Sequence, residues 1–595
     1  MKRWLMKRSK VDLTVMAQEL GIRRATAAVL VNRGLYSRRD AWNFLYGDET
    51  ALGDAAGMKD MEKGVSLLAE AIAQGRKIAV YGDYDVDGVT STTILYRTIL
   101  RCGGNALYYL PHRHKEGYGL NAAAVEGLAA EGVELLFTCD NGIAALAESA
   151  LAKEKGMTVV LLDHHEPGFT DEGEQRRDIL PTADAIIDPK QRDCPYPFKM
   201  LCAGGLSYYF ARLLLKKCGI ADEGLERQLL SFAAIATVCD IVDLLGENRL
   251  LVQQGLRELQ KTENIGLRVL IEEAGLSDKQ LTAYHLGFII GPCINAAGRL
   301  EDGMQAVRLF CTEDEAQARE QAKKLLRLNE ERKRLTEEAA ERAARLVEET
   351  NALRERVLVL YDPQIHESIA GIVAGRIKDT YYRPAILITG GAEDCKGSGR
   401  SIEGYHLFEA LFANRDLFTR FGGHAMAAGL SLPEENIAIL RQRLNAACTL
   451  TEQQLIPILR LEGALSFAEI DLRLAKELAA LAPFGKGNHE PLFGSKAIRV
   501  DRLDLIGKNK NILKFMLAEP KSGVRLPAIS FDGYESLKEL LKELYPEENC
   551  DTMLHSGRLP MLLDIAYSID INTYGGRSSV QLILKDFRFS EQEAT

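Results

Sequence analysis

The stretch YGDYDVDGVT, residues 81–90, decides the fold, because an apolar run leads into it and a helical pattern leads out of it. The preceding KIAVYG has the composition of a short buried strand, and the overlapping VTSTTILYRTIL predicts a helix. Three carboxylates alternate between them, at Asp83, Asp85 and Asp87. Carboxylates so close together repel one another unless a cation neutralises them. The loop therefore predicts a ligand site at the carboxyl end of a strand, where open α/β sheets place their ligands, rather than a solvated acidic turn.

The same pattern recurs at the ends of two further predicted strands. VELLFTCD ends in Asp140, and TVVLLD ends in Asp163, which His164 and His165 follow. Strands that alternate with helices predict βαβ units and a mostly parallel sheet, so these ends meet at one edge. Carboxylates with one or two imidazoles suit Mn²⁺ or Mg²⁺, and two such ions can activate a water and stabilise the leaving oxygen of a phosphodiester. If His165 is not a ligand, it can orient one or protonate the leaving group.

The composition is that of a globular chain with several domains. Its 595 residues exceed what one hydrophobic core holds, so we expect three or four domains. No apolar run reaches the roughly 18 to 20 residues of a membrane helix. The apolar stretch at residues 4–6 is also too short for a secretory signal, so we expect a cytoplasmic protein without a membrane segment.

Cysteine spacing and net charge narrow the function classes only a little. The 11 Cys residues include no C-x-x-C pair and mostly stand among apolar residues, so we expect buried, reduced thiols rather than disulfides or a zinc site. The formal net charge of −10 is unusual for a sequence-specific duplex binder, which is more often basic. Since a metal site needs carboxylates and a local basic groove can still bind a backbone, charge leaves a nucleic-acid partner open.

The rest of the chain predicts a long helix, a second α/β unit and a β-rich tail. Residues 312–349 are highly charged, lack Gly and Pro, and have the apolar spacing of an amphipathic connecting helix. RVLVLYD, residues 356–362, predicts the first strand of the second α/β unit. After about residue 455, short alternating runs predict a small β-barrel with a hairpin at Gly575-Gly576.

Several motifs together resemble one known family. DHHE at 163–166, with DYDVDG upstream and CDNG between them, resembles the DHH phosphoesterase superfamily. Further motifs, in the same order along the chain, are similar to those of its RecJ family: TVCDIVDL (237–244), GPCINAAGRL (291–300), HESIAGIVAGRI (366–377), GSGRS (397–401), FGGHAMAAGL (421–430) and LAPFGKGNHEPLF (481–493). The resemblance covers nearly the whole chain and implies a multidomain α/β protein. Its parts would be an N-terminal helical segment (1–50), a parallel-sheet DHH catalytic domain (51–311), the connecting helix (312–350), an α/β DHHA1 substrate-binding domain (351–452) and a C-terminal OB-fold β-barrel (453–595).

The resemblance also assigns metal ligands residue by residue. It implies two Mn²⁺ or Mg²⁺ ions held by Asp85, Asp87, Asp140, His164 and Asp240, with Asp83 as a further ligand or close neighbour. Asp163 and His165 complete the catalytic group. Tyr81 stands where many family members have a His, so the ligand set of the first ion departs from the family pattern.

A second set of residues is implied to contact the substrate: Arg113, Asn295, Arg299, His366, Arg376, Ser398, Arg400 and His424. Arg113, Arg299 and the pair Ser398 and Arg400 match family residues that meet the 5′ end of the strand. A guanidinium suits this task because it presents a planar fork of donors to phosphate oxygens. His424 is equally consistent with a structural histidine.

The function that the resemblance implies is a single-stranded-DNA-specific 5′→3′ exonuclease. It would release 5′-mononucleotides by metal-activated water attack on phosphodiesters, in DNA recombination and repair. The implied partners are single-stranded DNA with a 5′ end, a single-strand-binding protein and a RecQ-type helicase, and we expect a monomer. The barrel would grip the strand through Lys508, Lys510 and Lys514, with Phe515 and Tyr574 as its candidate stacking side chains.

Two other functions are alternatives. A related DHH enzyme that hydrolyses oligonucleotides or cyclic dinucleotides is usually shorter and lacks the barrel, so the residues after 455 argue against it. A non-catalytic DNA-binding scaffold would have lost metal ligands, whereas the aspartates and both histidines are present here.

Overall fold

The computed structural model describes residues 2–7, 11–47, 52–113, 115–172, 175–391, 393–557, 559 and 561–591. Contacts divide the chain into two compact units. The central unit is Leu52–Leu455, and the terminal unit combines Met1–Ala51 with Ile456–Thr595. No helix in the described ranges is both long and apolar enough to cross a membrane.

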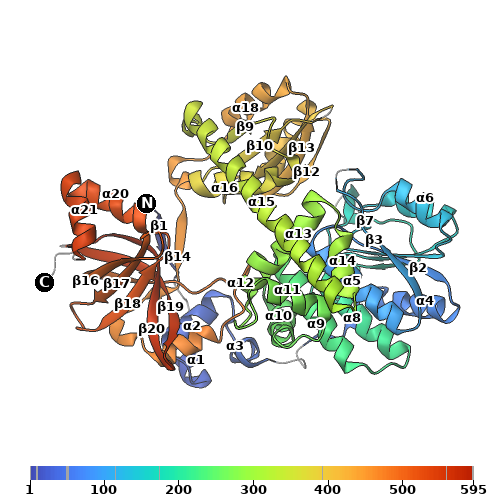
Figure 1. Cartoon of the computed structure of the whole chain (residues 1–595), viewed down its shortest axis with the longest axis horizontal. Coiled ribbons are helices and arrows are strands. Elements are labelled where there is room, and N and C mark those ends of the chain that lie inside the picture. The colour runs from blue at the N-terminus through green and yellow to red at the C-terminus, as the bar shows by residue number, and fades with distance from the viewer. Residues whose placement is uncertain are drawn as a thin grey trace. The chain divides into compact units, whose positions relative to one another are not determined.

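A five-stranded parallel sheet organises the first half of the central unit. Its order is β3-β2-β4-β5-β8 (Figure 1), made of Asn105–Tyr109, Lys77–Tyr81, Leu135–Cys139, Thr158–Leu162 and Ala185–Ile187. The chain runs from β2 to β3 on one side and then returns to β4 on the other side of β2. The direction of the strand order thus reverses between β2 and β4, which is where open α/β sheets bind their ligands. The parallel sheet predicted from the apolar runs is confirmed.

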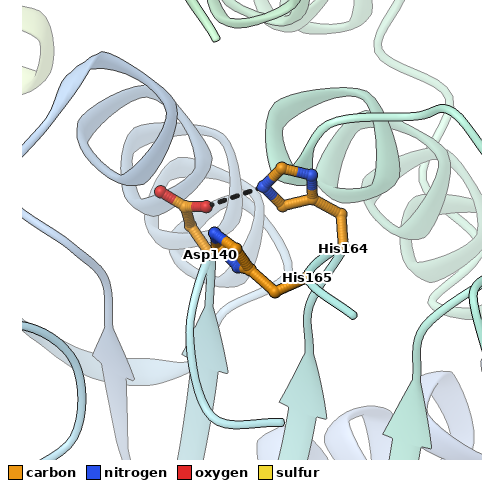
Figure 2. A group of neighbouring side chains, drawn as sticks. All are labelled: Asp140, His164 and His165. Atoms are coloured by element: carbon orange, nitrogen blue, oxygen red, sulfur yellow. Dashed lines mark hydrogen bonds and ion pairs between the residues drawn. The ribbon is translucent and has the colours of Figure 1, made fainter. Parts of the chain in front are cut away.

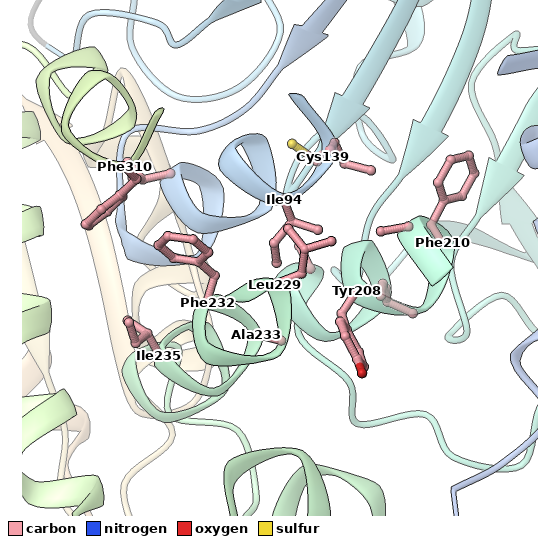
Figure 3. Packing of buried hydrophobic residues seen from close by; sticks show 14 of the residues in the cluster. Ile94, Cys139, Tyr208, Phe210, Leu229, Phe232, Ala233, Ile235 and Phe310 are labelled. Atoms are coloured by element: carbon pink, nitrogen blue, oxygen red, sulfur yellow. The ribbon is translucent and has the colours of Figure 1, made fainter. Parts of the chain in front are cut away.

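Helices cover both faces of this sheet. One face packs against α4 (Met61–Ala73), α5 (Val86–Arg101), α8 (Ala203–Lys217) and α9 (Glu223–Cys239), and the other packs against α6 (Ala122–Ala130) and α7 (Leu146–Glu154). Figure 3 shows the larger core, in which the Phe232 and Phe310 rings lie 5.0 Å apart between centroids. Each such buried ring stabilises the fold by about 1.5–3 kcal/mol. This packing fixes the strand ends that carry the site.

The remaining helices of the central unit lead to the second α/β part. They are α10 (Gly246–Leu259), α11 (Ile265–Glu273), α12 (Ala283–His285), the π-helical turn η3 (Leu286–Ile290), α13 (Gly291–Leu300), α14 (Met304–Cys311) and α15 (Glu315–Glu349). The carboxylate of Asp314 accepts a hydrogen bond from the Gln317 backbone at 3.0 Å and starts α15. The predicted long connecting helix is therefore confirmed.

The second α/β part is built on a mixed sheet. Its order is β12-β13-β11-β10-β9, made of Arg420–Gly423, Ala427–Leu432, Cys395–Arg400, Ala385–Thr389 and Leu358–Tyr361. Three helices accompany these strands: α16 (Glu367–Tyr381), α17 (Leu407–Phe412) and α18 (Asn436–Ala447).

The terminal unit contains a closed five-stranded barrel. Its strands are β16 (Phe493–Ile506), β17 (Ile512–Ala518), β18 (Arg525–Ser530), β20 (Arg577–Phe589) and β19 (Leu562–Tyr574), and β19 pairs back with β16 to close it. The predicted hairpin is confirmed, since Tyr574 pairs with Arg577 across Gly575 and Gly576, whose φ angles are 58° and 77°. Helices α19 (Leu472–Ala479), α20 (Tyr534–Leu544) and α21 (Glu547–Ser556) accompany the barrel.

The N-terminal segment belongs to this same unit. Strand β1 (Arg3–Met6), which the sequence did not indicate, pairs in parallel with β14 (Ile458–Leu461), and α1 (Leu13–Leu20), α2 (Arg24–Asn32) and α3 (Arg38–Tyr46) follow it. The amide of Asn32 donates to Glu462 Oε2 at 2.8 Å, and the Thr26 hydroxyl donates to Glu477 Oε2 at 2.8 Å.

The candidate basic edge of the barrel is confirmed as surface, but one aromatic candidate is wrong. Lys508, Lys510 and Lys514 are exposed, and Tyr574 is 87% exposed. Phe515 is only 2% exposed and packs edge-on against Phe587 inside the barrel, so it cannot stack on a base.

Candidate metal centre

The loop after β2 turns its carboxylates toward the edge of the sheet. Asp85 caps α5, because its Oδ1 accepts hydrogen bonds from the backbone of Asp87 at 2.9 Å and of Gly88 at 3.2 Å. Gly88 is required there, since a Cβ would lie 2.4 Å from the Asp83 carbonyl oxygen. Asp83 is 1% exposed, and its Oδ1 has no hydrogen-bond partner. A buried carboxylate oxygen without a donor fits a cation as its partner.

Asp87 lies in the first turn of α5 and points at another helix start. Its carboxylate accepts hydrogen bonds from the backbone of Ala203 at 2.8 Å and Gly204 at 2.7 Å, at the start of α8. Two helix N-termini thus favour negative charge at this position. Burial and the charge of Asp85 nevertheless raise the pKa of Asp87 to about 7.

Asp140 and His164 follow the neighbouring strands β4 and β5. Figure 2 shows the two side chains facing each other, with 3.1 Å between His164 Nε2 and Asp140 Oδ1. His164 Nε2 also lies 3.5 Å from Asp87 Oδ2, and its Nδ1 lies 3.8 Å from Asp240 Oδ2 at the end of α9. Burial and the neighbouring His165 lower the pKa of His164 to about 3, so its ring is neutral at pH 7, as a metal ligand must be.

Asp163 orients the histidines. It accepts hydrogen bonds from the backbone of Ile143 at 2.9 Å and His164 at 2.7 Å, and from Nδ1 of His165 at 2.7 Å. Although burial opposes the charged form, the bond to His165 lowers the pKa of Asp163 to about 2. Burial likewise opposes protonation of His165, but the bond to Asp163 raises the pKa of His165 to about 9. His165 can therefore hold a proton beside the metal ligands.

The predicted ligands gather into three overlapping groups, in each of which the ligand atoms lie within 4.8 Å of one another. The groups are Asp83, Asp85 and Asp140; Asp87, His164 and Asp240; and Asp140, His164 and His165. Burial and mutual repulsion raise the pKa values of Asp83 and Asp140 well above the usual range. A pair of divalent cations would relieve this repulsion, and carboxylates with one imidazole are donors that Mn²⁺ and Mg²⁺ accept. The donor set thus fits the predicted metals.

Tyr81 does not take the place of a metal ligand. Its ring lies in the core on the face of the sheet that α6 and α7 cover. It stacks on Tyr109, with 5.2 Å between the ring centroids. Its hydroxyl donates to the Gly119 carbonyl at 3.0 Å and accepts from the Asn121 amide at 3.1 Å. Tyr81 thereby holds the segment that follows Arg113.

The predicted phosphate-binding arginines form a second cluster. Arg299 donates from Nη1 to the Ser368 carbonyl at 2.8 Å. Burial, followed by the charges of Arg113 and Arg332, lowers the pKa of Arg299 to about 10, and the charge of Arg400 acts in the same direction. Like charges held this close favour a bound anion. Arg332, on α15, was not among the predicted site residues.

The other predicted substrate residues are placed as follows. Asn295 is half-buried on α13, one turn before Arg299, and Ser398 is half-buried on β11, two residues before Arg400. His366 caps α16, and its Nδ1 lies 2.7 Å from the Ser368 hydroxyl. Arg376 is exposed on α16, where its charge reaches Arg332. His424 is exposed in the turn between β12 and β13, so its role stays a prediction.

Sequence reasoning missed two residues near the metal ligands. Asp188 follows β8, is 1% exposed, and has a pKa raised to about 8 by burial and by Asp163. Its run AIID ends in a carboxylate like the other three strands, which could have indicated it. The Tyr118 hydroxyl lies 3.3 Å from His165 Nε2 and donates to the Asp140 carbonyl at 3.2 Å. Only the spatial neighbourhood indicates Tyr118.

Three family models match the chain. The DHH family, N-terminal domain, matches residues 77–237; the DHHA1 domain matches 354–450; and the RecJ OB domain matches 461–586. The single-stranded-DNA-specific exonuclease RecJ of Bacillus subtilis is 35% identical over 99% of this chain and 71% of its own length. The same enzyme of Dickeya dadantii is 36% identical over 88% of this chain and 89% of its own length.

Solved structures agree with these matches. RecJ of Thermus thermophilus in complex with Mn²⁺ aligns with a TM-score of 0.80 and 27% identity, over 100% of this chain and 80% of that one. Its complex with Mg²⁺ aligns with a TM-score of 0.74 and 25% identity, over 100% and 79%. The domain order, the acidic and histidine ligands and the full-length similarity lead to one conclusion: the chain belongs to the RecJ family of the DHH phosphoesterases.

Proposed function

We propose that this chain degrades single-stranded DNA from its 5′ end and releases 5′-mononucleotides, with two Mn²⁺ or Mg²⁺ ions as cofactors. The observation that carries this function is the buried set of ligand groups around Asp140 and His164, which lies at the switch point of the sheet. Nuclease activity on single-stranded DNA is the activity named for the relatives that match 99% and 88% of this chain.

The metal ligands we propose are Asp83, Asp85, Asp87, Asp140, His164 and Asp240. Bound there, the ions would supply an activated water and neutralise charge on the scissile phosphate. Asp163 orients His165 through its 2.7 Å hydrogen bond, and His165 holds the proton that the leaving 3′-oxygen needs. The Tyr118 hydroxyl meets the other ring nitrogen of His165 and so fixes the direction in which the ring faces.

The arginine cluster would hold the 5′ end of the strand. Arg113, Arg299 and Arg400 can form charge-assisted hydrogen bonds with a terminal phosphate. The Arg113 guanidinium lies 5.0 Å from the centre of the Tyr84 ring, which keeps it beside the loop of Asp83 and Asp85. A fixed 5′ end next to the metal ligands supports removal of one nucleotide at a time.

Several finer assignments are proposals that rest on the family. They are a role in recombination and repair beside a single-strand-binding protein and a RecQ-type helicase, a cytoplasmic location and a monomeric state. The segment limits at residues 50, 311, 350 and 452 are also proposals.

The test is a cleavage assay on an internally labelled, 5′-phosphorylated oligonucleotide with Mn²⁺, Mg²⁺ or EDTA. We expect mononucleotides from the 5′ end, only with metal and not from blunt duplex. Tight binding without cleavage would move the chain to the scaffold alternative, and cleavage of dinucleotides alone would move it to the small-substrate DHH enzymes.

A pair of variants tests the site itself. Asp140→Ala should abolish cleavage and leave DNA binding largely intact, because Asp140 belongs to two of the three ligand groups. Asp193→Ala, which removes an exposed carboxylate paired with Lys59, is the matched control and should keep full activity. Residual cleavage by a rigorously purified Asp140→Ala protein would contradict the ligand assignment.

A further inference from the structure

An exposed pair of stacked aromatic rings lies on the helical run before the phosphate-binding Arg299. Tyr284 and Phe288 are 62% and 67% exposed. Their ring centroids are 5.0 Å apart and the ring planes differ by 24°. Four residues separate them, so they share one face of the run formed by α12 and η3. Two large rings held parallel in solvent present an apolar surface that the described core does not use.

This run packs directly on the helix end that supplies Asp240. The thiol of Cys239 donates to the Leu286 carbonyl at 3.5 Å, and a Cβ built on Gly287 would lie 3.5 Å from Val238 Cγ1. Asp240 follows Cys239 immediately, at the end of α9. The run that carries the stacked pair therefore lies directly against the helix end that supplies Asp240.

The backbone near Asp240 is unusual in two places. Ile241 has a φ of +58° and is 65% exposed, although a β-branched side chain is strained in the left-handed region. Residues 286–290 form a π-helical turn, a feature frequently found at functional sites. Both features flank Asp240 in space or in sequence, and both carry apolar side chains into solvent.

We infer that Tyr284 and Phe288 form a stacking platform for bases of the single-stranded substrate, an inference that rests on the proposed function. Base stacking suits an enzyme that must accept any sequence, because every base has a π-face. The run continues into α13, which carries Arg299, the residue proposed to hold the terminal phosphate. At about 1.5 Å per residue, Phe288 lies roughly 16 Å from Arg299 along this run. The stacked bases are therefore not the 5′-terminal one.

The test measures cleavage by the full chain with Tyr284→Ala, Phe288→Ala and both changes. We expect KM for a 5′-phosphorylated strand to rise about tenfold in the double variant, as loss of base stacking predicts, with kcat changed less than twofold. Phe288→Trp keeps an aromatic ring at this position, so its KM should equal that of the parent. Tyr36→Ala removes an equally exposed tyrosine of the terminal unit, 64% exposed, and should change neither constant.

Abasic substrates separate stacking from a structural role. A set of strands carries a single abasic nucleotide, each at a different position. For the parent, KM should rise when the abasic nucleotide is at one or two internal positions. For the double variant, the abasic nucleotide should not raise KM further. An unchanged KM, equal abasic sensitivity in both proteins, or a shift in oligomeric state by sedimentation would overturn the platform. Absence of cleavage by the parent in the same assay would instead overturn the proposed function.

Discussion

Tyr118 illustrates how a residue outside the ligand set can shape the chemistry. It is 56% exposed, yet its hydroxyl joins the Asp140 backbone to the ring of His165, and its own ring meets His165 edge-on with 6.1 Å between centroids. Desolvation of its hydroxyl and the surrounding carboxylates raise the pKa of Tyr118, so the hydroxyl keeps its proton. It can therefore orient His165 without adding charge to the centre.

Removal of this hydroxyl should slow the reaction without loss of metal. In Tyr118→Phe we expect kcat to fall by about ten- to a hundredfold, which is typical when a group that supports reactive residues is lost. Calorimetric titration with Mn²⁺ should give the parent affinity. Tyr46→Phe, at a tyrosine 53% exposed in the terminal unit, is the control, and an unchanged kcat in Tyr118→Phe would remove its positioning role.

Metal affinity should depend on pH through Asp87. Burial and the charge of Asp85 raise the pKa of Asp87 to about 7, so below that pH the free carboxyl is mostly protonated and must lose its proton before it can bind a cation. We expect the Mn²⁺ affinity to fall as the pH drops from 8 to 6. Titrations in buffers of different ionisation enthalpy should show proton release, and an affinity that is independent of pH would contradict this.

At the scale of elements, the sequence predicted the strands that are followed by residues of the candidate site. β2, β4 and β5 are continuous buried runs that each end in a carboxylate, so fold and site were visible together. β8 has only three residues and was missed, and Asp188 was missed with it. β1 could not be predicted, because its four residues are mostly exposed and its partner β14 lies over 450 residues away in the chain.

The error at Phe515 has a simple physical cause. Along β17, side chains alternate between solvent and barrel interior, so Lys514 and Met516 face outward while Phe515 faces inward. An aromatic residue between two outward positions is a core residue. This alternation of polar and apolar residues is readable in the sequence itself. In the arginine cluster, the family resemblance indicated Arg113, Arg299 and Arg400, whereas Arg332 required the fold, since it lies on α15 outside those motifs.

The lysines of the β16–β17 hairpin provide a prediction at this scale. Replacement of Lys508, Lys510 and Lys514 by Ala should weaken binding to a long single strand. The logarithm of the affinity falls with the logarithm of the salt concentration, and each lost phosphate contact makes this dependence shallower by about 0.7. Loss of all three lysines should therefore reduce the magnitude of the slope by up to about 2. Cleavage of a strand too short to reach the barrel is the internal control and should stay unchanged. An unaltered slope would place the DNA path elsewhere on the barrel.

At the scale of the whole molecule, the terminal unit depends on both ends of the described chain. Lys7 and Asn32 both contact Glu462, at 3.0 Å and 2.8 Å, and Glu462 is only 7% exposed. The Trp4 indole donates to Asp586 at 2.6 Å, and the Arg588 guanidinium lies 4.4 Å from the centre of its ring. A buried carboxylate held by residues from the N-terminal segment ties the two segments together.

Asn32→Ala should destabilise the terminal unit alone. It leaves one oxygen of the buried Glu462 without its amide donor, which costs about 1–3 kcal/mol of unfolding free energy. Scanning calorimetry should show the transition of the terminal unit at a lower temperature and that of the central unit unchanged. Asn43→Ala, at an exposed position on α3, is the control. Equal shifts in both transitions would contradict the division into two units.

The split composition of the terminal unit also sets an order of events during synthesis. Residues up to 47 leave the ribosome early, but their partners begin at Ile456, after the whole of Leu52–Leu455 has been made. At about 5 to 20 residues per second, these 404 intervening residues take roughly 20 to 80 s. Throughout that interval α2 has no α19 to pack against, while the central unit can fold as it emerges. The nascent N-terminal segment thus completes its packing only after the last part of the chain has been made.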